Sequence, residues 1–175
     1  MRRGLCKRII AWVLLIVMLV GEMPYGVMAR SETDLKEFLT EVVLTDDKGK
    51  QIPEKDGKLK IEKGDTYKLS MTFSETQDHQ FPDEGDMTYT IPEGLEMVGG
   101  GIKTFDIRVT YNGAGGVPQT VTVKDNTYEI KNGILTVKFN AQDPNYDKLK
   151  GSDNVTFTIN NDFKVTEEIT EIAFS

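Results

Sequence analysis

Apolar and polar residues alternate along most of the chain after residue 36, with the period of two that is typical of half-buried β-strands. Residues 67–73 (YKLSMTF) show it most clearly, because Tyr67, Leu69, Met71 and Phe73 share one face. The pattern predicts further strands in the segments 38–45, 59–61, 87–91, 105–111, 121–123, 128–130, 135–139, 155–165 and 169–174. A brief helical turn is expected at 33–37, and no helix is sustained.

These nine or ten short strands predict an all-β fold. Each strand has one apolar face that must pack against another sheet, so we expect a two-sheet antiparallel β-sandwich. The segment 37–175 is expected to form one domain, with 30–36 as a short lead-in, because the roughly 146 residues after position 29 suffice for one core. Asn132-Gly133 is a strong hairpin signal between two of the strands.

Residues 1–29 have the pattern of a secretory signal peptide. Four basic residues precede an unbroken apolar run of twelve residues at 9–20, and Val27-Met28-Ala29 offers a cleavage point. A transmembrane span needs about 20 apolar residues, so this run is too short for one. The sequence therefore predicts secretion, with cleavage after Ala29 and no membrane segment afterwards.

Charge and composition narrow the function classes further. The whole chain has a formal net charge of -7, and without residues 1–29 it has 17 Lys+Arg against 27 Asp+Glu, a net charge of -10. Such an acidic chain would be repelled by phosphate backbones, so we expect no nucleic-acid partner. Cys6 lies in the leader and His79 is the only histidine, which argues against disulfides, thiolate zinc sites and most histidine catalysis. No cofactor motif is present.

The order of the strand segments resembles the N-terminal Ig-like domains of Gram-positive surface adhesins, the collagen- and fibrinogen-binding MSCRAMM type. The most specific match is GDMTYTIPEGL at 85–95, and the others are FLTEVVLTDDKGK at 38–50, KGDTYKLSMTF at 63–73, GILTVKF at 133–139 and NVTFTINNDF at 154–163. The resemblance covers nearly all of 36–165. It implies an Ig-like sandwich at the cell surface or cell wall, without enzymatic activity, that binds a host matrix or plasma protein.

Two features depart from that family. Its members commonly bind ligands between two tandem domains and end in a wall-sorting signal, whereas one domain is expected here and the chain stops at Ser175. We therefore expect this chain to be part of a longer surface protein, or a truncated product, whose further domains or wall attachment lie in a region outside it.

Some domains of that family contain an internal Lys–Asn isopeptide bond promoted by a buried carboxyl group, which makes Asn161 a candidate. It shares strand parity with Ile159 and Phe163, so we expect it to face inward. No inward lysine is expected opposite it, because the lysines considered lie on the polar parity of their strands (Lys68, Lys124 and Lys138). An asparagine at a bulge or strand end is the alternative interpretation.

Two acidic loops, and Tyr111 beside another loop, hold the remaining candidate residues. The spacing of Asp143, Asn145 and Asp147 matches the start of a calcium loop, but positions six and twelve are not the required Gly and Glu, so a solvated loop is the preferred interpretation. The segment 75–86 and the tyrosines beside loops are expected to contact a ligand, since binding residues concentrate on loops. These ligand candidates are Glu75, Asp78, His79, Asp83, Glu84, Tyr111 and Tyr146.

The sequence as a whole favours non-enzymatic binding to a host extracellular protein, through sheet edges and inter-strand loops. A structural spacer or pilin-like module is the first alternative. A carbohydrate-binding module is the second, and it would need a planar row of exposed aromatic side chains. A hydrolase with paired carboxylates is the weakest, because no convergent pair can be named and a fold alone does not settle function.

Overall fold

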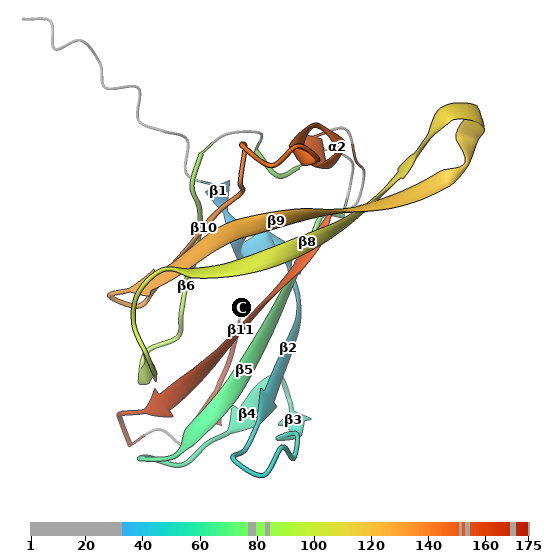
Figure 1. Cartoon of the computed structure of the whole chain (residues 1–175). Helices are drawn as coiled ribbons and strands as arrows, with labels where there is room; N and C mark the ends of the chain where they lie inside the picture. Colours follow the sequence, from blue (N-terminus) through green and yellow to red (C-terminus); the bar gives the residue numbers. More distant parts are fainter. Residues whose placement is uncertain are drawn as a thin grey trace, which may run out of the picture. The chain divides into compact units, whose positions relative to one another are not determined.

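The computed structural model describes residues 33–76, 80–82, 85–150, 152, 155–168 and 171–174. The chain divides into a first unit, 1–31, and a second unit, 32–175. The expected signal peptide at 1–29 lies outside the described residues. The second unit is an all-β structure built from three sheets (Figure 1).

Two larger sheets form the body of this unit. The five-stranded sheet has the order β1 (Thr33–Asp34), β6 (Met87–Thr90), β10 (Ile134–Lys138), β9 (Pro118–Lys131) and β8 (Lys103–Asn112). The four-stranded sheet has the order β2 (Leu39–Thr45), β5 (Thr66–Ser74), β11 (Thr156–Val165) and β7 (Leu95–Met97). All neighbours are antiparallel except the short pair β1 and β6, which is parallel.

A small third sheet lies beside the four-stranded one. It has the order β12 (Glu171–Ile172), β4 (Lys58–Lys60) and β3 (Glu54–Lys55). Its strands β12 and β4 lie far apart in the sequence, and Ile172 pairs with Leu59. An exposed ion pair of 3.2 Å between Lys58 Nζ and Glu171 Oε2 joins the same two strands.

The core lies between the apolar faces of the two larger sheets. Strand β5 alternates as expected from its sequence, with Tyr67, Leu69, Met71 and Phe73 all buried. Phe157 on β11 is the centre of an aromatic cluster, with ring centroids 5.4–5.7 Å from those of Phe73, Phe81, Phe105 and Phe139. Because these rings come from several strands and from two segments outside strands, their burial ties the two sheets together.

Among the described residues, three short helices interrupt the β structure: 3₁₀ helices η1 (Leu35–Phe38) and η2 (Ala114–Gly116), and the one-turn helix α2 (Tyr146–Lys150). The first matches the brief helical turn expected near 33–37. Helix α2 replaces part of the loop that was expected after Asp143, since Tyr146 and Leu149, three residues apart, both pack into the core.

Strand β9 is longer than the two separate strands expected around Asp125-Asn126. Asp125 has a φ of 56°, and the side chain of Asn126 turns inward and is completely buried. Its Nδ2 donates to the carbonyls of Phe105 and Val123, and its Oδ1 accepts from the Asn140 backbone N–H at 3.0 Å. The side chain thus replaces the ladder hydrogen bonds lost at the irregularity. Figure 1 shows β8 and β9 extending as a hairpin arm beyond the other strands.

Candidate binding groove

Strand β2 forms one edge of the four-stranded sheet. On one side it pairs with β5. On the other side a backbone hydrogen bond is present near its C-terminal end, where the Ile52 N–H donates to the Leu44 carbonyl at 2.8 Å. Backbone groups of alternate residues face the same edge of a strand, so the N–H and C=O of Val42 face the same side as those of Leu44. Within the described residues, no strand is paired with β2 at Val42 on that side. An unpaired edge of this kind is a template for pairing with another chain.

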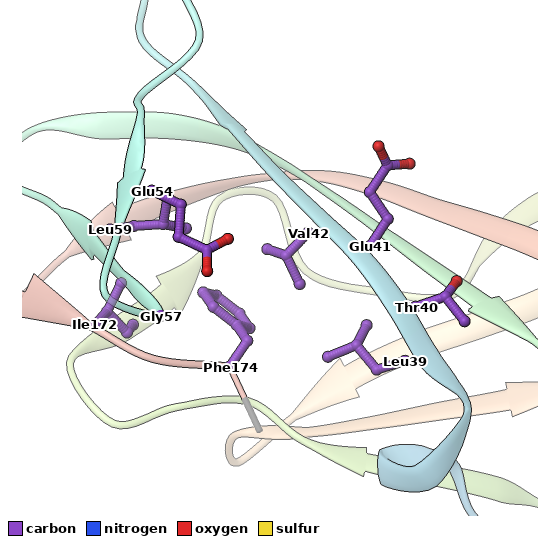
Figure 2. Close-up of a pocket in the computed structure, with 9 residues that line it drawn as sticks. All are labelled: Leu39, Thr40, Glu41, Val42, Glu54, Gly57, Leu59, Ile172 and Phe174. Carbon is purple, nitrogen blue, oxygen red and sulfur yellow. The ribbon is translucent and has the colours of Figure 1, made fainter.

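A groove of about 170 Å³ runs beside this edge, between β2 and the small third sheet (Figure 2). Its lining residues are Leu39, Thr40, Glu41, Val42, Glu54, Gly57, Leu59, Ile172 and Phe174. Figure 2 shows the side chains of Leu39, Val42 and Phe174 directed toward one space. All three are partly buried and pack against the core, so they form an apolar floor that solvent still reaches.

The charged side chains that line the groove are all acidic. Its lining contains two carboxylates, Glu41 and Glu54, and no lysine or arginine. Both residues are exposed, and Figure 2 shows the Glu54 carboxylate beside the Phe174 ring while Glu41 points away along the rim. An apolar floor with an acidic rim suits a peptide that carries apolar and basic side chains.

A second hollow, of about 400 Å³, lies between the hairpin arm and α2. It includes Tyr111, whose ring lies 4.9 Å from Lys148 Nζ and whose hydroxyl donates to Gln119 Oε1 at 2.9 Å. The Tyr111 ring is therefore held in place by an internal cation–π contact. The hollow is lined mostly by polar side chains.

The structure places two expected ligand residues in the interior. Glu75 is 6% exposed, and its carboxylate accepts hydrogen bonds of 2.7–2.8 Å from the backbone N–H groups of Gln80, Phe81 and Val155. Tyr146 is 8% exposed and belongs to the core. Neither side chain is presented to a ligand. The other candidates of that loop, Asp78, His79, Asp83 and Glu84, lie outside the described residues.

The residues considered for a calcium loop instead make hydrogen bonds within the protein or belong to a helix. The Asp143 carboxylate accepts from the backbone N–H groups of Lys124 and Asn145, and these two hydrogen bonds lower its pKa. Asn145 Nδ2 donates to the Thr122 carbonyl, and Asp147 lies in the first turn of α2. In the part of the chain that the structure describes, no group of three or more His, Cys, Asp or Glu side chains is arranged to hold a metal ion.

Asn161 does face inward, as its strand parity predicts, and is 4% exposed. The expectation that no lysine faces it was wrong, because Lys103 Nζ on β8 donates directly to Asn161 Oδ1 on β11. Lys103 has the same parity as Phe105, Ile107 and Val109, the inward positions of its strand, and this signal was available in the sequence.

Comparisons with protein-family models, with curated proteins and with solved structures found no match for this chain. Among the residues that the structure describes, no helix is long and apolar enough to cross a lipid bilayer.

Proposed function

We propose that the protein is a secreted, non-enzymatic binding domain of the bacterial cell surface, resembling an Ig-like adhesin domain. Its partner would be a host extracellular protein, bound as an extended segment along the outer edge of β2. The observation that supports this proposal is the coincidence of an unpaired strand edge at Val42 with a groove beside it that contains the side chains of Leu39, Val42 and Phe174.

Such a segment would pair with β2 by backbone hydrogen bonds and place alternate side chains in the groove, as in other cases of strand addition. The floor of Leu39, Val42 and Phe174 favours apolar side chains at those alternate positions. The carboxylate of Glu54, and the net charge of -10 that remains without residues 1–29, favour a segment with basic residues.

One structural observation speaks against a carbohydrate-binding module. The large apolar side chains that are exposed in the described residues are Val98, Ile102, Val117 and Ile134, and none is aromatic. A planar aromatic platform for sugar stacking is therefore not offered by these positions.

The proposal is tested by measuring binding of the secreted chain to an array of matrix proteins, plasma proteins and glycans. A saturable hit on a protein is expected, and a hit on glycans alone would replace the proposal with a carbohydrate-binding module. Absence of any hit would favour a spacer.

The site is tested by Val42→Pro, which removes the edge N–H without removing a hydrogen bond to β5. The affinity should fall by about tenfold, since one lost hydrogen bond of ~1.4 kcal/mol corresponds to that factor. The matched control, Val42→Thr, keeps the N–H and the β-branched shape and should bind within about threefold of the parent. Equal binding by Val42→Pro and the parent would place the ligand elsewhere.

A further inference from the structure

Strand β8 forms one edge of the five-stranded sheet and is ten residues long (Figure 1). It pairs with β9 on one side, and within the described residues no strand is paired with its other side. Exposed residues occupy every even position from 104 to 112 without interruption, because the extra residue of the irregularity near Asp125 lies in β9. A long, regular and unpaired edge is a template for pairing with another strand.

The backbone groups of the even-numbered residues face this free edge. Arg108 lies opposite Thr122 of β9, and the Thr122 carbonyl accepts from Asn145 Nδ2 at 3.0 Å. In an antiparallel pair whose carbonyl is directed away from the partner strand, neither residue bonds to the other, so the N–H and C=O of Arg108 also point away from β9. Backbone directions alternate along a strand, so the same holds at the other even positions from 104 to 110.

Two opposite charges lie side by side in the exposed row of β8. Asp106 and Arg108 are two positions apart, so both side chains stand on the exposed face of the strand. Arg108 is the only arginine after residue 30, and it forms no ion pair among the described residues. The Asp106 carboxylate accepts from the Asp125 N–H at 3.3 Å through one of its oxygens. The edge thus presents one anion and one cation beside unused backbone groups.

We propose that the protein forms a symmetric dimer in which the β8 strands of two copies pair antiparallel, with the two-fold axis at Ile107. In this register Asp106 of each copy lies opposite Arg108 of the other, and Thr104 lies opposite Thr110. All of these residues have backbone groups that face the free edge, so the pairs exchange hydrogen bonds. Opposite charges directly across an antiparallel pair stabilise it, and a two-fold contact of this kind closes on itself.

The same two charges select this register over its neighbours. Moving the axis to Asp106 places that carboxylate opposite its own copy, and moving the axis to Arg108 does the same for the guanidinium. Like charges directly opposite each other are destabilising, and larger shifts separate Asp106 from Arg108 of the second copy. The contact lies at β8 of the five-stranded sheet, whereas the groove lies at β2 of the four-stranded one. The dimer is therefore independent of the proposed binding function.

The first test is the molar mass of the secreted chain, measured by analytical ultracentrifugation over a concentration series at low salt. The mass is expected to rise with concentration from that of one copy to that of two, and to rise less at high salt, which screens exposed charges. A mass that stays at one copy up to ~1 mM would overturn the proposal.

The second test exchanges the charges. Asp106→Arg and Arg108→Asp each place like charges across the axis, so the dissociation constant of each variant alone should rise by at least about tenfold. A mixture of the two variants should form a heterodimer with nearly the affinity of the parent, because every cross-strand pair again unites opposite charges. Recovery on mixing also shows that both variants are folded.

The matched control is Lys131→Asp, which makes the same change of charge as Arg108→Asp at an exposed position of β9. It should dimerise like the parent. An equal loss in Lys131→Asp and Arg108→Asp would mean that net charge controls association, and unchanged dimerisation of Arg108→Asp would place the contact elsewhere. Either result, or failure of the mixed variants to associate, would overturn the pairing at β8.

Discussion

At the scale of single residues, three buried polar side chains tie distant segments together. Glu75 joins the loop after β5 to the start of β11, Asn126 holds the irregular part of β9, and Asn161 contacts Lys103 from the other sheet. Each has hydrogen-bond partners for its buried polar atoms, which is the condition under which burial of a polar group is tolerated.

The Glu75 carboxylate should contribute strongly to stability. Glu75→Ala leaves three backbone N–H groups without their acceptor in a buried place, and we expect the free energy of unfolding to fall by about 3 kcal/mol. Urea denaturation of the two proteins measures the difference. The exposed turn residue Glu93 is the matched control, since Glu93→Ala should change stability by less than about 0.5 kcal/mol. Equal effects of the two substitutions would contradict the assigned role.

The Asp143 carboxylate should make part of the stability depend on acidity. Its pKa is lowered in the folded state by the backbone hydrogen bonds from Lys124 and Asn145, so its contribution is present above its unfolded pKa and is lost as the pH falls through the lower, folded pKa. Asp143→Asn should therefore be less stable than the parent at pH ~7, and the difference should be smaller at pH ~2. Unfolding midpoints at the two pH values check this, and a difference that stays constant would refute it.

Strand parity predicted the inward position of Asn161 but its lysine partner was missed. Lys103 lies just before the strand that the pattern predicts at 105–111, whereas β8 begins at Lys103. Long lysine side chains also lie along apolar surface more readily than their charge suggests. A strict count of parity from Phe105 backwards would have found it.

At the scale of elements, local turn chemistry was the most reliable signal. Asn132-Gly133 forms the tight turn between β9 and β10, where Lys131 pairs with Ile134, and both turn residues have positive φ values of 52° and 75°. This is the backbone that the dipeptide favours in a two-residue hairpin.

Gly133→Val should destabilise the domain through the backbone alone. No atom lies within 4 Å of a Cβ added at Gly133, so the expected cost of about 1–2 kcal/mol comes from the left-handed conformation. Gly100→Val is the matched control, because Gly100 is also open to solvent and its φ lies outside that region. Thermal unfolding of both variants decides the matter, and an equal loss in both would show that added apolar surface rather than φ is responsible.

The carboxylate of Glu54 at the groove leads to a prediction about the affinity for a basic peptide. Glu54→Lys reverses the charge beside Phe174, and it should weaken binding of a basic extended peptide at low salt and much less at high salt. Glu129→Lys makes the same change on the five-stranded sheet and should leave the affinity nearly unchanged. Affinities measured at two salt concentrations test this. An equal loss in both variants would mean that net charge, rather than the groove, attracts the ligand.

At the scale of the whole molecule, the alternating pattern predicted an all-β fold correctly. It did not predict which strands pair when they are far apart in the sequence. The groove exists because β12 pairs with β4, whose partners Ile172 and Leu59 lie far apart in the sequence. The parallel contact of β1 with β6 is a similar case. Neither contact leaves a periodic trace in the local sequence, so residues such as Leu39 and Phe174 could not be identified as neighbours beforehand.

The contact of Lys103 with Asn161 has a further consequence for a domain placed under tension. The two residues are 58 positions apart and lie on strands of different sheets, β8 and β11, so a pull that separates the sheets loads this contact. Hydrogen bonds with an ionised donor are stronger than neutral ones. Lys103→Ala should therefore lower the force at which the sheets separate in single-molecule stretching, while the force of a variant at the exposed residue Glu93 should stay unchanged.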